Sequence, residues 1–261
     1  MARSPARLAR SLAFSVAFYA SLAVHAVAAL PTLLLPRRFA LAFIRSYARS
    51  TLWLLRVICG ITVEWRGFDK IPPGACIVAC KHQSAWETIS LYAVMGDPAY
   101  ILKRELMWLP FYGWYARKAR LIPVDRSAGM AALSRMAAIA QRELARGRQI
   151  VIFPEGTRRA VGAEPDYKPG VAFLYGRAGV PCVPMALNSG LFWPRRSLER
   201  VPGTIVVEAL EPIPPGLDRQ TFMTRLESTL EQATARLVRE SGIRSQESGR
   251  KDQGPGVDAS S

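Results

Sequence analysis

The sequence predicts an α/β fold, with a mixed sheet flanked by helices and membrane-associated helices at the N-terminus. Three observations predict it: half of the 261 residues are hydrophobic, long apolar runs fill the N-terminal segment, and short β-rich runs alternate with helical patterns after Gly60. Such alternation is typical of a sheet with helices packed on its faces. We expect a membrane-associated helical segment over 1–59, an α/β domain over 60–240 and a disordered tail over 241–261.

The first expected element is an apolar helix. From Leu12 to Leu30 the chain has no Asp, Glu, Lys or Arg, and this length approaches what a helix needs to cross a bilayer. A cleaved signal peptide is the competing interpretation, since Ala26-Val27-Ala28 resembles a cleavage site behind a basic start. Basic residues flank the run on both sides, so charge does not distinguish a spanning helix from a shallow re-entrant one.

A second helix is expected over Phe39–Cys59. Arg45, Arg49 and Arg56 interrupt its apolar residues at spacings that gather them on one face. This face suits a helix at the level of lipid headgroups, with the arginines toward phosphate. A solvated face on a packed helix fits the pattern nearly as well.

The domain after Gly60 is expected to hold seven strands, each a short β-rich run. They lie at Thr62–Trp65, Ala75–Cys80, Tyr100–Lys103, Leu121–Val124, Ile150–Phe153, Val180–Leu187 and Thr204–Leu210. Helices with an apolar stripe are expected at Met130–Arg146 and at about Arg219–Glu240. Ser241–Ser261 is polar and lacks apolar periodicity, which predicts disorder.

The formal net charge of +15 favours an anionic partner, such as nucleic acid, an acidic leaflet or a phosphorylated substrate. Nucleic acid is disfavoured, because the arginines are scattered through apolar sequence without a zinc-finger or RNA-binding signature. The four cysteines form no Cys-x-x-Cys pair and the chain has two histidines. We therefore expect buried free thiols in a reducing compartment and no metal site.

The segment Lys81–Thr88 places a histidine five positions before a carboxylate. His82 follows an apolar run and should lie at the C-terminal end of a strand, where ligand sites of α/β sheets concentrate. If Ser84 caps the next helix, Glu87 lies in its first turn, close enough to hold one ring nitrogen of His82. The other nitrogen then takes a proton from a hydroxyl that the substrate supplies. A purely structural histidine is the alternative.

The segment Val151–Arg159 is an apolar run that ends at Pro154 and continues as Glu155-Gly156-Thr157-Arg158-Arg159. The glycine turn lets the backbone approach a ligand closely. Guanidinium groups bind phosphate through two hydrogen bonds, which predicts a cationic seat for an anionic substrate. Paired arginines that merely face solvent are the alternative.

The region between these segments adds one more cation and a group of aromatic residues. Arg126 follows a short expected strand, so it is a candidate for the same cationic pocket. The aromatic residues line an acyl groove, contact the membrane interface or belong to the core; they are Trp108, Phe111, Tyr112, Trp114 and Tyr115.

Together these residues resemble the bacterial glycerolipid acyltransferase family, over roughly Ile61–Leu210. The family's His-x4-Asp motif, with its base and orienting acid, corresponds to His82 and Glu87. Its Glu-Gly-Thr-Arg motif matches Glu155, Gly156, Thr157 and Arg158, which implies contacts with the glycerol and phosphate of the acceptor. Arg126 closes the middle motif and is implied to contact phosphate, and Val183–Gly190 resembles the block that shapes the acyl side.

The resemblance implies the glycerolipid acyltransferase fold and a 1-acylglycerol-3-phosphate O-acyltransferase of phospholipid biosynthesis. His82 would deprotonate the sn-2 hydroxyl of lysophosphatidic acid, which would then attack acyl-CoA or acyl-carrier protein to give phosphatidic acid. No metal or cofactor is required. Because the acyl donors are made in the cytosol, the expected location is the cell inner membrane, with the catalytic domain on the cytoplasmic side.

The chain departs from the family at the acid of the first motif, which is Glu87 in place of aspartate. A catalytically impaired lipid-binding protein therefore stays open as an alternative, and so does the same chemistry on another acceptor, such as a lyso-ornithine lipid. Lys81 stands where the family often has a neutral polar residue, and we expect its charge to be exposed.

Overall fold

The computed structural model describes residues 4–125 and 129–251, with the backbone alone over 243–251. Its centre is a seven-stranded sheet in the order β1-β7-β6-β2-β5-β3-β4. The strands are β1 Ile61–Arg66, β2 Cys76–Cys80, β3 Pro98–Lys103, β4 Ile122–Val124, β5 Gln149–Ile152, β6 Cys182–Leu187 and β7 Gly203–Ala209. β6 and β7 pair antiparallel and all other neighbours pair parallel, so the mixed sheet is confirmed.

Each expected strand is present, displaced by two residues at most at either end. The central strands are apolar throughout because both of their faces are covered. In β2, Ile77 and Ala79 face one hydrophobic cluster, while Val78 and Cys80 face the other. The buried, continuous apolar run that identified this strand is therefore the direct result of its central place in the sheet.

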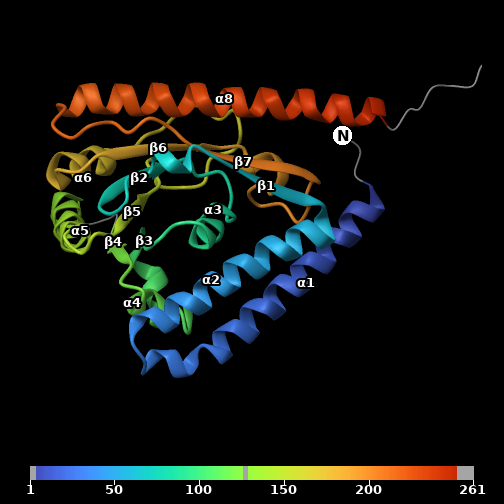
Figure 1. The fold of residues 1–261 in the computed structure, drawn as a ribbon, viewed down its shortest axis with the longest axis horizontal. Coiled ribbons are helices and arrows are strands. Elements are labelled where there is room, and N and C mark those ends of the chain that lie inside the picture. Colours follow the sequence, from blue (N-terminus) through green and yellow to red (C-terminus); the bar gives the residue numbers. More distant parts are fainter. Residues whose placement is uncertain (1–3, 126–128, 252–261) are drawn as a thin grey trace, which may run out of the picture.

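Helices cover both faces of the sheet, as Figure 1 shows. One face carries α5 (Gly129–Leu144), α6 (Gly170–Ala178) and α8 (Arg219–Lys251), and the other carries α1 (Pro5–Ala28), α2 (Arg37–Leu54) and α3 (Glu87–Ser90). The shorter helical elements are too brief to show periodicity in the sequence. They are η1 Leu30–Leu33, η2 Leu55–Cys59, η3 Phe68–Lys70, η4 Leu91–Ala93, η5 Arg104–Trp108, α4 Tyr112–Lys118 and α7 Ser189–Phe192.

The last helix begins at Arg219 as expected but continues to Lys251. The disordered tail expected over 241–261 is therefore wrong over 241–251, while 252–261 lie outside the described residues. The physical reason is that nothing in this stretch stops a helix. Its first proline is Pro255, and Gly242 and Gly249 each weaken a helix by only about 1 kcal/mol.

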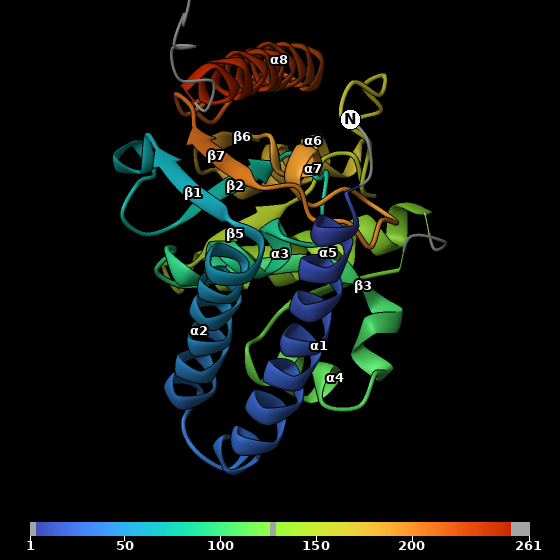
Figure 2. The same cartoon turned by 90° about the vertical axis from the view of Figure 1, so that its right-hand side faces the viewer.

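The two N-terminal helices form an antiparallel hairpin whose turn points away from α8 (Figure 2). The start of α1 is attached to the domain where Ser11 Oγ accepts a hydrogen bond from the Arg200 backbone N–H at 2.9 Å. Its far end is attached where the Tyr115 hydroxyl donates to the Ala26 carbonyl at 2.6 Å. Lys118 Nζ donates to the Leu33 carbonyl at 2.8 Å.

The outer side of this hairpin is apolar and exposed. Val16, Val24 and Leu34 are exposed to 72, 65 and 93%. In the described part of the chain, α1 is the one helix long and apolar enough to cross a membrane. Of the three arginines expected on one helix face, Arg45 in α2 hydrogen-bonds the Gly96 carbonyl, whereas Arg49 in α2 and Arg56 in η2 are exposed.

Candidate active site

The site lies at the edge of the sheet where β2, β3, β4, β5 and β6 end, because these five strands run parallel. His82 follows β2 by two residues, Lys103 is the last residue of β3, and Glu155 follows β5. The parallel pairing of β2 with β5 therefore brings the two sequence motifs together.

Glu87 orients His82 directly. His82 Nδ1 lies 2.9 Å from Glu87 Oε1, and the carboxylate is completely buried. The same oxygen accepts the backbone N–H groups of Gln83 and Ser84 at 2.7 and 2.6 Å. Ser189 Oγ donates to the second oxygen at 2.9 Å. The carboxylate is thus fixed by four hydrogen bonds, and it holds the ring with Nε2 available to take a proton.

The local turn differs from the expected capping arrangement. Glu87 does lie in the first turn of α3, but the N-cap residue is Trp86 and no side chain caps the helix. Ser84 Oγ instead accepts the Trp86 N–H at 3.1 Å, inside the tight turn before the helix. Within this turn, Glu87 Oε1 contacts both His82 Nδ1 and the Gln83 and Ser84 N–H groups.

The backbone of His82 is held from the other motif. Glu155 Oε2 accepts the His82 N–H at 2.9 Å, and the Arg159 N–H donates to the His82 carbonyl at 2.8 Å. The Phe153 ring stacks on the imidazole at 4.1 Å between centroids, with 19° between the planes. Phe153 was expected only as a strand residue, and its contact with His82 had no signal in the sequence.

Lys81 corrects the sequence interpretation, because its side chain is buried rather than exposed. Its ammonium lies 2.6 Å from Glu155 Oε1, so both oxygens of Glu155 have partners inside the protein. A buried carboxylate requires such a counter-charge. Glu155 therefore holds the His82 turn, and it also lines the cavity, where the resemblance implies a contact with the acceptor.

Arg158 supplies a cation at the site. It is exposed, lines the cavity next to His82, and its guanidinium forms no ion pair with another described residue. Gly156 has a φ of +67°, a left-handed conformation that glycine adopts without strain. Thr157, the next residue, is exposed to solvent. Arg159 points elsewhere, with its guanidinium on the Glu164 carbonyl at 2.8 Å and 3.6 Å from Asp166. Arg126 lies outside the described residues.

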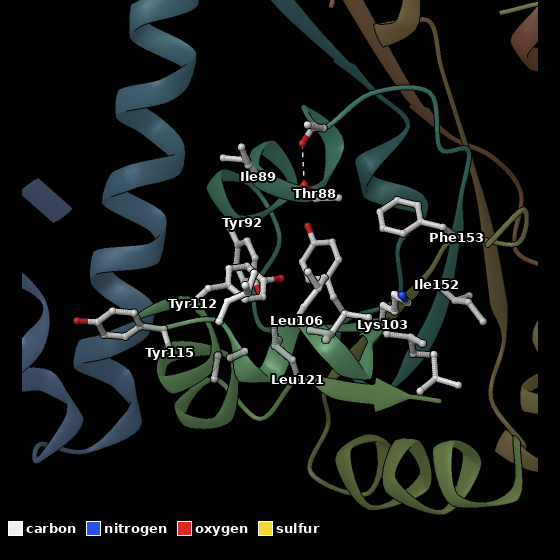
Figure 3. A pocket seen from close by; sticks show the side chains of 18 of the residues that line it. Thr88, Ile89, Tyr92, Lys103, Leu106, Tyr112, Tyr115, Leu121, Ile152 and Phe153 are labelled. Carbon is white, nitrogen blue, oxygen red and sulfur yellow. Dashed lines mark hydrogen bonds between the residues drawn. The ribbon is translucent and has the colours of Figure 1, made fainter. Parts of the chain in front are cut away.

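An apolar cavity of about 1260 Å³ opens beside His82 and extends to α1 and α2. Figure 3 shows Tyr92, Tyr112 and Leu106 around it, with Lys103 and Phe153 at the end nearer the motifs. Two lysines that the sequence analysis did not single out, Lys103 and Lys168, also line it. Of the five candidate aromatics, Phe111, Tyr112 and Tyr115 line the cavity, while Trp108 and Trp114 do not and are exposed.

Comparisons with known proteins identify the family. Residues 62–188 match the family model described as Acyltransferase. The 1-acyl-sn-glycerol-3-phosphate acyltransferase of Pseudomonas aeruginosa is 39% identical over 175 residues, which make up 67% of this chain and 68% of that protein. This chain belongs to the acyltransferase family.

Two further members of the acyltransferase family bear on fold and acceptor. The lyso-ornithine lipid O-acyltransferase of P. aeruginosa is 31% identical over 189 residues, covering 64% of this chain and 70% of that protein. The crystal structure of the 1-acyl-sn-glycerophosphate acyltransferase PlsC from Thermotoga maritima superposes with a TM-score of 0.72 at 23% identity. It covers 88% of this chain and 98% of that one, so the fold is shared.

The fourth block of this acyltransferase supports the His82 turn. Residues 183–190 are absent from the cavity lining, contrary to the expectation that they shape the acyl side. Ser189 bonds Glu87, and the Gly190 N–H donates to Gln83 Oε1 at 3.1 Å. A side chain at position 190 would place its Cβ 2.8 Å from Val161 Cγ2 and 3.1 Å from Gln83 Cβ, so the neighbouring side chains would have to shift.

Neither a metal site nor a disulfide is found in the part of the chain that the structure describes. There, no three His, Cys, Asp or Glu side chains are arranged to hold a metal ion. The four cysteines are unpaired and buried, as expected. Burial raises the pKa of the Cys76 thiol to about 11, so this thiol stays protonated and unreactive near neutral pH.

Proposed function

We propose that this acyltransferase moves a fatty acyl group from an acyl thioester to the sn-2 hydroxyl of lysophosphatidic acid, giving phosphatidic acid. The observation that carries the proposal is the His82–Glu87 pair at the mouth of a large apolar cavity, with Arg158 beside it. The 39% identical relative from P. aeruginosa bears the name of this activity. No serine or cysteine nucleophile is needed, because the acceptor brings its own hydroxyl.

In the proposed reaction His82 Nε2 accepts the proton of the acceptor hydroxyl as its oxygen attacks the thioester carbonyl. The resulting tetrahedral intermediate collapses, the carbon–sulfur bond breaks, and the leaving thiolate takes the proton back from the imidazolium. Glu87 stabilises the imidazolium and keeps the ring in position. General-base assistance of this kind contributes about 10²–10⁴-fold to the rate.

Arg158 is the proposed seat of the acceptor phosphate. Lys103 and Lys168 line the same cavity, but each already has an acid close by, Glu105 at 3.2 Å and Asp166 at 2.7 Å. The Arg158 guanidinium has no such partner among the described residues, so it can offer both of its N–H edges to a phosphate. Gly156 and Thr157 form the turn that carries it, and Arg126 is proposed to join it.

The apolar cavity is the proposed place of the acyl chain. Its volume of about 1260 Å³ exceeds the range of roughly 300–1,000 Å³ that is usual for small-molecule pockets. Tyrosines and leucines line it, and α1 and α2 close its far end. Acyl-CoA and acyl-carrier protein are both proposed as donors.

The headgroup of the acceptor is tested through Arg158. Arg158→Ala is expected to raise the KM for lysophosphatidic acid about 10- to 100-fold, because hydrogen bonds to a charged group contribute about 1.5–3 kcal/mol. Arg158→Lys should restore part of the loss. Steady-state kinetics on detergent-solubilised protein would measure it, with Arg225→Ala on the exposed side of α8 as the matched control. An unchanged KM in Arg158→Ala would show that Arg158 does not bind the acceptor phosphate.

A lyso-ornithine lipid is the second candidate acceptor, since a relative named for that activity is 31% identical. Its carboxylate is also a partner for a guanidinium. The same assay run with both lipids separates the two. A higher kcat/KM with lyso-ornithine lipid than with lysophosphatidic acid would favour this candidate over the first.

We further propose that the protein lies on the cytoplasmic side of the inner membrane, with the α1–α2 hairpin in one leaflet. Both ends of α1 are bonded to the catalytic domain, while its outer face is apolar. A helix that crossed the bilayer would carry one of these ends away from the domain.

The topology is tested with single cysteines at Ser4 and Arg38, on either side of α1. A membrane-impermeant maleimide is expected to label both from the cytoplasmic side, in inverted vesicles and not in spheroplasts. The native cysteines are buried and should give little background. Labelling of the two positions from opposite sides would show that α1 spans the membrane.

A further inference from the structure

A buried lysine directly precedes the base. Lys81 Nζ lies 2.6 Å from Glu155 Oε1 and 2.7 Å from Glu231 Oε1, and its side chain is 5% exposed. Glu155 in turn accepts the His82 N–H at 2.9 Å. The contacts therefore form a continuous chain from Glu231 on α8 through Lys81 and Glu155 to the backbone of His82.

Tyr167 completes the surroundings of the ammonium. Its hydroxyl donates to Glu231 Oε1 at 2.8 Å, and its ring faces Lys81 Nζ at 5.4 Å from the centroid. Burial, followed by the Glu231 carboxylate, raises the pKa of Tyr167 well above its usual range. The phenol of Tyr167 therefore stays protonated and uncharged. Among the described residues, Lys81 is the one cation that pairs with both Glu155 and Glu231.

The charge balance makes Lys81 essential to the arrangement. Glu155 is 1% exposed, and a buried carboxylate without a counter-charge is strongly disfavoured. Without Lys81, Glu155 would take up a proton or move toward solvent. Either change weakens its hold on the His82 N–H.

α8 has other attachments to the sheet that do not involve the site. Arg66 on β1 pairs with Glu240 at 2.8 Å, and Arg236 pairs with Glu208 on β7 at 2.6 Å. Glu231 differs from these because its partner belongs to the turn that carries the base. An effect specific to Glu231 can therefore be separated from a general loosening of α8.

We propose that Lys81 is a positioning residue, which fixes Glu155 and, through Glu155, the backbone of His82. Glu231 of α8 fixes Lys81 in turn through its ion pair with the ammonium. The inference rests on the proposed function for its kinetic consequence. It predicts that damage to this chain of contacts lowers kcat and leaves the KM for the acceptor unchanged, because Arg158 lies outside it.

Four variants test the proposal in the full-length protein. Glu231→Gln is expected to lower kcat roughly three- to tenfold, and Lys81→Met about 100-fold. In Lys81→Met/Glu155→Gln the buried charge is gone and the amide oxygen still accepts the His82 N–H, so kcat should recover at least about tenfold over Lys81→Met. Glu240→Gln is the matched control and should leave kcat and KM as in the wild type.

Hydrogen–deuterium exchange supplies a readout that does not need activity. Amides of residues 81–84 should exchange at least about tenfold faster in Glu231→Gln and in Lys81→Met, and at the wild-type rate in Glu240→Gln. Inactive wild-type protein would count against the proposed function, while the exchange result would still decide the role of Lys81. The inference is overturned if Glu231→Gln matches Glu240→Gln in both readouts, or if the double variant is no better than Lys81→Met.

Discussion

His82→Ala is expected to lower kcat about 10³- to 10⁴-fold, near the upper end of what general-base catalysis contributes. His25 also lines the cavity, but its ring nitrogens lie against the Ser21 carbonyl and Ser46 Oγ, whereas Nδ1 of His82 is held by the buried Glu87 carboxylate. The KM for lysophosphatidic acid should change little, because the phosphate is held by Arg158. The rate of labelled phosphatidic acid formation measures both parameters.

The control for His82→Ala is a measurement that its fold and stability match those of the wild type. The side chain of His82 stacks on Phe153 and bonds Glu87; Phe153 packs against one of the two hydrophobic clusters, but His82 itself belongs to neither. Circular dichroism and the melting temperature should therefore stay close to wild type. A variant that retains more than about a tenth of wild-type kcat would show that His82 is not the base.

Glu87→Gln carries the second largest expected effect, a fall in kcat of about 10²- to 10³-fold. The amide oxygen can still accept the three N–H groups that now meet Oε1, and the amide N–H₂ can donate to Ser189. The substitution therefore removes the charge that stabilises the imidazolium while it preserves the turn. Kinetics at saturating substrate measure the loss, with KM as the internal control.

Glu87→Asp tests the length of the acid. It draws the carboxylate back by about 1.5 Å, so the contacts with His82 Nδ1 and with the Gln83 and Ser84 N–H groups cannot all persist. A kcat between those of wild type and Glu87→Gln is expected. If Glu87→Gln were as active as wild type, the carboxylate would have no role in catalysis.

The sequence was sufficient for the elements that form the site. Apolar runs ending at His82 and Glu155 placed both motifs at strand ends, and parallel pairing of β2 with β5 then brings them together. The His82–Glu87 contact was also predictable, because a tight turn followed by a helix limits where Glu87 can point. These features depend on residues close in the chain.

What the sequence could not predict depends on distant partners. Lys81 is buried because it pairs with Glu155 and Glu231. These partners are 74 and 150 residues away in the sequence, so no local pattern predicts the pairing. The same holds for Ser189, whose hydroxyl donates a hydrogen bond to Glu87, 102 residues away in the sequence. Through this bond the fourth block supports the acid of the site, whereas the sequence predicted that it shapes the acyl side. The stacking of Phe153 on His82 likewise follows from the register of β2 and β5.

The most direct test of the proposed function is the position of the acyl group in the product. Purified wild-type protein would be given lysophosphatidic acid with labelled acyl-CoA or acyl-carrier protein, and the product cut with an sn-2-specific lipase. We predict phosphatidic acid whose label is released entirely from the sn-2 position. Folded wild-type protein that forms no labelled phosphatidic acid with either donor would contradict it.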